Sequence, residues 1–282
     1  MALLSGRTAV VTGAGGGLGR AYAHLFAREG ANVVVNDHAA DLAQQVVEEI
    51  HAQRGTAVSC AWDVGAMDSG SRLLATALEH FGRVDILINN AGILRDRSLV
   101  KMEEADWDAV QRVNLKGTYL VTRPIFQWMK DNAVKGVIIN TTSTSGLIGN
   151  FGQSNYAAAK GGVWAFTHVL ALEGARYGIR VWNLAPAAVT GLTANLVAPE
   201  LREELAPEHV APTVLYMASD LSAPHTGKTL FASGRRIMEL KLQAAPGIAG
   251  RGVDARQIAA SANRIFHSAP DFTLADLEQS PV

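Results

Sequence analysis

The sequence predicts an α/β fold in which a single doubly wound parallel sheet carries helices on both faces. Short, continuous apolar runs alternate along the chain with segments that have helical patterns. Apolar runs without polar alternation are typical of strands that are covered on both sides. Repeated strand–helix units with right-handed crossovers bring such strands into one parallel sheet. The predicted strands are residues 8–12, 32–36, 56–60, 85–89, 136–140 and 179–184.

The helical segments fill the gaps between these strands, and no internal repeat or linker interrupts residues 1–240. The composition changes at "AAPGIAGRG", which indicates a turn. We therefore divide the chain into one α/β domain, residues 1–240, and a C-terminal extension, residues 241–282, whose role the sequence does not indicate. The predicted helices are residues 18–29, 39–53, 68–81, 103–130, 155–177 and 208–219.

Composition excludes several classes of function. Hydrophobic residues make up 48% of the chain, charged residues 18%, and the net charge is −1, so we predict no nucleic acid or membrane partner. A single cysteine excludes an intrachain disulfide and fits a reducing compartment, and no apolar run is long enough for a membrane span. We therefore predict a cytoplasmic location. The eight histidines lack metal-ligand spacing, so we predict no metal site.

A glycine-rich turn follows the first predicted strand and opens the first helix. It reads T-G-x-x-x-G-x-G and lacks the common G-x-G-x-x-G spacing. Glycines let the backbone approach a bulky anion, and the first N–H groups of the following helix point at that anion. The strand before and the helix after it favour a pyrophosphate site over a merely structural turn. We assign cofactor contacts to Gly13, Gly16, Gly17, Leu18 and Gly19.

Asp37 ends the second predicted strand. Its carboxylate can accept both ribose hydroxyls of an adenosine and would repel a 2′-phosphate, which favours NAD over NADP. The structural alternative is an aspartate that caps the next helix. Other strands end at the same edge of the sheet and supply further candidate contacts. These are Asp63 for the adenine amino group, Val64 for the flat face of adenine, and Asn90, Ala91 and Gly92 beside the ribose and nicotinamide.

Ser143 follows the fifth predicted strand, and Tyr156 and Lys160 lie four residues apart in the next helix. Residues i and i+4 share a helix face, and a nearby ammonium lowers the pKa of a phenol from its usual value of about 10. Tyr156 can then exchange the alcohol proton while hydride passes to or from NAD, and Ser143 can donate to the developing carbonyl oxygen. Lys160 can also hold the nicotinamide ribose, so we assign Tyr156 and Lys160 as cofactor contacts too. Asn114 is expected to anchor a water that links Lys160 to solvent. An ordinary surface helix is the alternative.

In this order, the glycine turn, "NNAG", the asparagine of "RVNLKG" and Ser143 with its Tyr-x-x-x-Lys partner resemble the short-chain dehydrogenase/reductase superfamily. The resemblance covers roughly residues 5–235. It implies a Rossmann-type sheet of about seven strands, a Ser-Tyr-Lys-Asn tetrad and a homodimer or homotetramer. The Pro-Gly pair that is usual after the sixth strand is here only Pro186, and we carry Pro186 and Val189 over as cofactor contacts.

A narrower resemblance is carried by "NNAGILRDRS", "GNFGQSNYAAAK" and "PEHVAPTVLYMAS". These stretches are similar to the (3R)-hydroxyacyl-CoA dehydrogenase unit of peroxisomal multifunctional enzyme type 2 and to its bacterial single-domain relatives. The resemblance implies an enzyme of lipid metabolism that oxidises a (3R)-3-hydroxyacyl-CoA to the 3-oxo thioester with NAD.

Three alternatives stay open: a 17β-hydroxysteroid dehydrogenase, an NADPH-dependent 3-oxoacyl carrier-protein reductase, and a catalytically silent NAD-binding sensor. The segment 187–210 is expected to lie over the nicotinamide as a lid. Its residues Leu192, Leu196 and Val197 would present apolar surface to an acyl chain or a steroid. The basic candidates for contacts with a CoA nucleotide are Arg95, Arg97 and Arg202.

Overall fold

The protein is described here by a computed structural model, which covers residues 2–191, 202–250 and 252–266. The chain divides into two compact units, Met1–Glu239 and Leu240–Val282.

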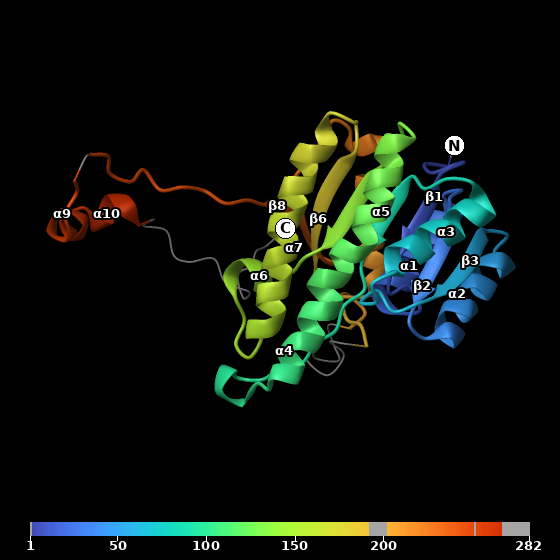
Figure 1. Cartoon of the computed structure of the whole chain (residues 1–282), viewed down its shortest axis with the longest axis horizontal. Helices are drawn as coiled ribbons and strands as arrows, with labels where there is room; N and C mark the ends of the chain where they lie inside the picture. The colour runs from blue at the N-terminus through green and yellow to red at the C-terminus, as the bar shows by residue number, and fades with distance from the viewer. Residues whose placement is uncertain (1, 192–201, 251, 267–282) are drawn as a thin grey trace. The chain divides into compact units, whose positions relative to one another are not determined.

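An eight-stranded sheet forms the centre of the fold, with the strand order β3-β2-β1-β4-β5-β6-β7-β8 (Figure 1). All six strand pairs between β3 and β7 are parallel. This confirms the predicted α/β class, and the order reverses direction between β1 and β4, where ligands bind in such sheets. The strands are β1 (Thr8–Val11), β2 (Asn32–Asp37), β3 (Thr56–Ala61), β4 (Ile86–Asn89), β5 (Val137–Thr141), β6 (Arg180–Pro186), β7 (Lys228–Ala232) and β8 (Ile237–Leu240).

Two of these strands, β7 and β8, come after the six that the sequence predicts. β8 alternates exposed and half-buried residues, and β7 begins with an exposed lysine. Neither strand therefore has the continuous apolar run by which the central strands are recognised.

Helices of the first unit cover the sheet on both faces (Figure 1). Successive strand residues point to opposite faces, so Val11 and Val35 pack with α1, α2 and α8, whereas Val10 and Val34 pack with α3, α5 and α7. Within the described ranges, none of the helices is both long and apolar enough to span a bilayer. The helices are α1 (Gly17–Arg28), α2 (Ala40–Ala52), α3 (Ser69–Phe81), α4 (Glu104–Val110), α5 (Gly117–Asp131), α6 (Ser145–Ile148), α7 (Ser154–Ala175), α8 (Ala211–Ala218), α9 (Ala255–Ala260) and α10 (Ala262–Ile265).

The segment predicted as one helix, residues 103–130, contains a π-helical turn at Gln111–Lys116 between α4 and α5. The prediction of one regular helix is therefore wrong at this turn. Asn114 lies in the turn with its side chain completely buried, and it forms hydrogen bonds to the loop after β4. Because the partner is a distant loop, the local sequence pattern could not indicate the turn. π-helical turns are frequent at functional sites.

The second unit contains α9 and α10. Asp254 starts α9 with a capping box, in which its carboxylate accepts from the Gln257 N–H and its own N–H donates to Gln257 Oε1. The Gly247 N–H donates to the Arg264 carbonyl at 2.8 Å. Neither helix has a buried residue.

Candidate active site

The turn between β1 and α1 packs directly against the loop that follows β4. Gly13 has a φ of +62°, and a Cβ there would lie 2.8 Å from the Cα of Ala91. A Cβ at Gly19 would overlap the Gly13 carbonyl and would lie 2.7 Å from Nδ2 of Asn90. Any side chain at either glycine would push the two segments apart, which is the physical reason that glycine stands at both positions.

Thr12 and Asn90 fix this contact with hydrogen bonds. Thr12 Oγ1 accepts from the N–H groups of Asn90 and Ala91 at 3.0 and 3.1 Å. The Asn90 amide donates to the carbonyls of Thr12 and Gly13, both at 3.1 Å. Thr12 is the first residue of the T-G-x-x-x-G-x-G motif, but the sequence assigns it no role, because a short hydroxyl side chain at a strand end carries little information without its partners.

The start of α1 fits a bound anion. Its N-cap, Gly16, has no side chain that could accept from the first-turn N–H groups, and the first turn contains no acidic residue. These N–H groups lack acceptors within the helix and carry the positive end of its dipole. A Cβ at Gly16 would meet no atom within 4 Å, so the backbone there is open to a ligand. Leu18 packs against the core beneath the turn, and the residues therefore fit a pyrophosphate group.

Asp37 links the end of β2 to the glycine turn. Its Oδ2 accepts from the Gly15 N–H at 3.0 Å, and its Oδ1 accepts from the Ala39 N–H at 3.1 Å. His38 Nδ1 lies 2.9 Å from the same Oδ1. The N-cap of α2 is Ala39, so Asp37 is not a simple helix cap. The carboxylate therefore stands beside the anion site with remaining lone pairs, which fits a ribose.

Asp63 has partners that its position in the sequence did not indicate. Its Oδ1 accepts from the Gly65 N–H at 2.8 Å, and its Oδ2 lies 2.6 Å from Nη1 of Arg112 in the π-helical turn. Burial acts to raise the pKa of Asp63, but the bonds from Arg112 and Gly65 outweigh it and hold that pKa below its usual value. Val64 is buried and packs against Gly117 at the start of α5. A contact of either residue with adenine stays a prediction.

Lys160 lies at the centre of the predicted catalytic group. Its side chain is 3% exposed, its Nζ donates to the Thr141 carbonyl at 2.7 Å, and the same atom lies 5.6 Å from the ring centroid of Tyr156. A Cβ at Gly92 would lie 3.3 Å from Asn114 Oδ1 and 3.7 Å from Lys160 Nζ. The fold thus brings β4, β5, the π-helical turn and α7 together around one ammonium.

The protonation of the pair differs from the expectation. Burial raises the pKa of Tyr156 to about 12, a hydrogen bond with Ser143 acts to lower it, and the charge of Asp96 raises it further. Burial also lowers the pKa of Lys160 to about 8. The expected lowering of the Tyr156 pKa is therefore wrong for the described chain, because removing a phenolate from water costs more than the hydrogen bond with Ser143 returns.

Asn114 uses both ends of its side-chain amide on one backbone partner. Its Oδ1 accepts from the Ile93 N–H at 2.8 Å, and its Nδ2 donates to the Ile93 carbonyl at 3.0 Å. The side chain therefore holds the loop after β4 against the π-helical turn. The water relay from Lys160 stays a prediction.

The chain after β6 returns to the glycine turn. Pro186 ends β6 and is paired with Ala232 of β7, and the Val189 N–H donates to the Leu205 carbonyl at 2.7 Å. Thr190 lies against Gly17, at which a Cβ would be 3.2 Å from the Thr190 side chain. The lid residues Leu192, Leu196 and Val197 lie outside the described residues. Arg95, Arg97 and Arg202 are exposed.

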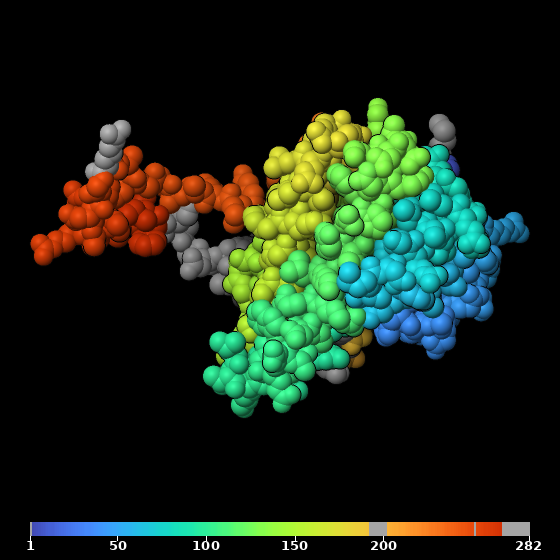
Figure 2. Space-filling model, in the orientation of Figure 1, coloured from blue at the N-terminus to red at the C-terminus, as the bar shows by residue number. Residues whose placement is uncertain are grey.

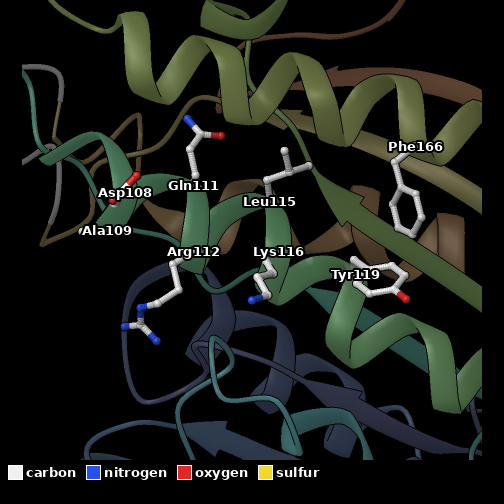
Figure 3. Close-up of a pocket in the computed structure, with 8 residues that line it drawn as sticks. All are labelled: Asp108, Ala109, Gln111, Arg112, Leu115, Lys116, Tyr119 and Phe166. Atoms are coloured by element: carbon white, nitrogen blue, oxygen red, sulfur yellow. The ribbon is translucent and has the colours of Figure 1, made fainter. Parts of the chain in front are cut away.

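A hollow of about 660 Å³ lies outside the predicted catalytic group, between the π-helical turn and α7 (Figure 3). The rings of Tyr119 and Phe166 meet edge to face there, with centroids 6.4 Å apart. Ser143, Tyr156 and Lys160 do not line it. Its lining residues are Asp108, Ala109, Gln111, Arg112, Leu115, Lys116, Tyr119 and Phe166.

The described residues contain no group of three or more His, Cys, Asp or Glu side chains that could hold a metal ion.

Comparisons with known proteins agree on one family. The sequence profile described as short chain dehydrogenase matches residues 7–201. The crystal structure of a short chain dehydrogenase from Mycobacterium avium has a TM-score of 0.84 and 39% identity, and the match covers 93% of this chain and 95% of that one. These matches confirm the superfamily resemblance carried by the glycine turn and the Tyr-x-x-x-Lys pair.

Two curated relatives give the narrower similarity. A hydroxyacyl-CoA dehydrogenase of Mycobacterium tuberculosis is 42% identical over 252 residues, which are 83% of this chain and 79% of that protein. Peroxisomal multifunctional enzyme type 2 of Mus musculus is 44% identical over 224 residues, which are 76% of this chain and 30% of that protein. This chain spans about a third of the length of the multifunctional relatives that it matches.

Proposed function

Because the chain belongs to the short-chain dehydrogenase/reductase family, whose members bind nicotinamide cofactors, we propose that it oxidises (3R)-3-hydroxyacyl-CoA to 3-oxoacyl-CoA with NAD. The observation that carries the proposed reaction is the meeting of Ser143, Tyr156 and Lys160 beside a glycine turn open to an anion. The proposed substrate is supported by the similarity to a hydroxyacyl-CoA dehydrogenase.

The proposal of NAD over NADP rests on Asp37. A carboxylate that already binds the glycine-turn backbone at 3.0 Å can accept from ribose hydroxyls, and it would repel a 2′-phosphate. Gly13, Gly17 and Gly19 would hold the pyrophosphate over the start of α1. When bound, the nicotinamide supplies hydride transfer.

The proposed roles of the chain's own residues follow from their chemistry. In the oxidation, Tyr156 takes the proton from the substrate hydroxyl as the C–H hydride leaves, and in the reverse direction it returns that proton. Ser143 bonds with the phenol and donates to the oxygen that becomes a carbonyl. Lys160 supplies the positive charge beside the phenol.

Steady-state assays separate this proposal from its alternatives. We expect NAD-dependent NADH formation with (3R)-3-hydroxyacyl-CoA substrates over a series of chain lengths. Turnover only with 17β-hydroxysteroids, or only with 3-oxoacyl carrier protein and NADPH, would favour the corresponding alternative. Binding of NAD without turnover of any of these substrates would favour the sensor.

We propose a homodimer or homotetramer, supported by an apolar surface on α5 and α7, which lie side by side in Figure 2. Tyr119 on α5 is 45% exposed, and Val169 and Leu172 on α7 are 52% and 80% exposed. Such a surface is typical of an interface between copies. Analytical ultracentrifugation tests it: Leu172→Glu should lower the mass of the assembly, whereas Leu221→Glu, at an exposed leucine elsewhere, should not. A monomeric unmodified chain would contradict the proposal.

We also propose a cytoplasmic location, supported by the single cysteine, which fits a reducing compartment. Cell fractionation tests it, and recovery of the protein outside the soluble cytoplasmic fraction would contradict it.

A further inference from the structure

The loop after β4, residues 90–98, is joined to the start of α7 by several hydrogen bonds. The Arg97 N–H donates to the Gly152 carbonyl at 2.9 Å. The buried Asn155 side chain donates to the Arg95 carbonyl, also at 2.9 Å. Because Asn155 directly precedes Tyr156, these bonds fix the backbone position of Tyr156 at the start of α7.

Asp96 lies in the middle of this junction. Its Oδ2 accepts from Nε2 of Gln153 at 2.8 Å, and Gln153 is itself 6% exposed. The other oxygen, Oδ1, is buried and has no hydrogen-bond partner among the described residues. Gln153 is anchored in turn by Asn150, whose amide donates to Gln153 Oε1 at 3.2 Å. A carboxylate with one oxygen unsatisfied keeps most of its electrostatic effect on its surroundings.

The charge of Asp96 acts on Tyr156. Burial is the first cause of the raised pKa of Tyr156, Ser143 acts against it, and Asp96 acts in the same direction as burial. Ser143 therefore favours phenolate and Asp96 opposes it. The other charged group beside the ring is Lys160, whose Nζ lies 5.6 Å from the ring centroid.

We infer that Asp96, held in place through Gln153, is a positioning residue that orients the start of α7 and opposes loss of the Tyr156 phenol proton. Asp96 and Ser143 then have opposite effects on the phenol, so the tyrosine holds its proton more firmly than it would without the charge of Asp96. For alcohol oxidation, this moves the rise of activity to higher pH. The role of Asp96 in catalysis rests on the proposed function, whereas its effect on the phenol does not.

The first test is the pH profile of kcat/KM for oxidation of a 3-hydroxyacyl-CoA by the full chain. Asp96→Asn removes the charge and keeps an acceptor for Gln153, so the acidic limb should move to lower pH. Glu104→Gln removes an exposed carboxylate on α4 and should leave the limb in place. Gln153→Ala should lower kcat while the KM for NAD stays unchanged, because the link between Asp96 and α7 is lost.

The second test does not depend on turnover. In protein labelled with ¹³C at the tyrosine ζ carbon, the Tyr156 signal is assigned by its loss in Tyr156→Phe. At one alkaline pH at which circular dichroism shows all variants folded, D96N should contain a larger phenolate fraction than the unmodified chain or Glu104→Gln. Equal phenolate fractions and superimposed pH profiles would overturn the inference. Failure of every substrate together with a larger phenolate fraction in D96N would remove the proposed function and leave the effect of Asp96 standing.

Discussion

Lys160 Nζ lies 5.6 Å from the Tyr156 ring centroid while it donates to the Thr141 carbonyl at 2.7 Å. One ammonium therefore forms a hydrogen bond with the end of β5 and lies beside the Tyr156 ring, and its side chain is almost fully buried. Its charged form is destabilised by that burial, which lowers its pKa to about 8.

Lys160→Met should lower kcat/KM for oxidation by roughly 10²- to 10⁴-fold, the range expected when a group that supports proton transfer is removed. The loss should appear mainly in kcat, because the ammonium acts on the phenol. Steady-state kinetics with NADH detection measures it. Unchanged turnover would show that the ammonium does not assist Tyr156.

The same substitution, Lys160→Met, should lower activity without lowering the free energy of unfolding. The pKa of Lys160 falls from 10.5 to about 8 on folding, so its burial costs on the order of 3 kcal/mol below pH 8, and this cost disappears as pH rises toward 10.5. The substitution also removes the hydrogen bond to the Thr141 carbonyl, which destabilises the variant by about 1–3 kcal/mol. Lys160→Met should therefore be at least as stable as the unmodified chain at pH 7, and its relative advantage should shrink between pH 8 and 10.5. Urea unfolding over this pH range measures it, and a constant difference would contradict the burial argument.

Tyr156→Phe removes only the phenol oxygen. We expect a loss of roughly 10²- to 10⁴-fold in kcat, with the affinity for NADH retained, because the proton acceptor is lost and the glycine turn is not. Fluorescence titration with NADH gives the affinity. In the unmodified chain, oxidation should increase with pH because the pKa of Tyr156 is raised. A pH profile that is flat across the alkaline range would contradict this.

Gly19→Ala and Gly16→Ala form a matched pair in the same turn. A Cβ at Gly19 overlaps the Gly13 carbonyl, whereas a Cβ at Gly16 meets no atom within 4 Å. Gly19→Ala should therefore cost about 1–3 kcal/mol of stability, as overpacking does, and should weaken NADH binding. Gly16→Ala should leave the free energy of unfolding nearly unchanged in the absence of cofactor. Equal stability losses in the two variants would refute the close-packing explanation.

Asp37→Ala should reduce the preference for NAD over NADP. The carboxylate binds the Gly15 N–H at 3.0 Å, and its charge would repel a 2′-phosphate. The ratio of kcat/KM for the two cofactors should fall by about tenfold or more, the equivalent of roughly 1.4 kcal/mol. Asp41→Ala, at an exposed acidic residue in the first turn of α2, is the control and should leave the ratio unchanged.

Much of the fold could be predicted from local patterns. The central strands are continuous apolar runs because both of their faces are covered, and the helices between them follow the 3.6-residue period. β7 and β8 lack this signal because β7 begins with an exposed lysine and β8, the last strand of the sheet, alternates exposed and half-buried residues. The π-helical turn at Gln111–Lys116 could not be predicted either. Its Asn114 side chain forms hydrogen bonds with Ile93, which belongs to a different segment of the chain.

The sequence by itself determined that the glycine turn, Asp37 and Ser143 stand at strand ends, and that Tyr156 and Lys160 share one face of a helix. It did so because helical and strand periods restrict where a side chain can point. Only the tertiary structure decided the state of those groups. Burial and the charge of Asp96 raise the pKa of Tyr156, and they outweigh the hydrogen bond with Ser143, which lowers it. Desolvation and electrostatic interaction depend on distances between segments far apart in the chain, and no local pattern of residues contains those distances.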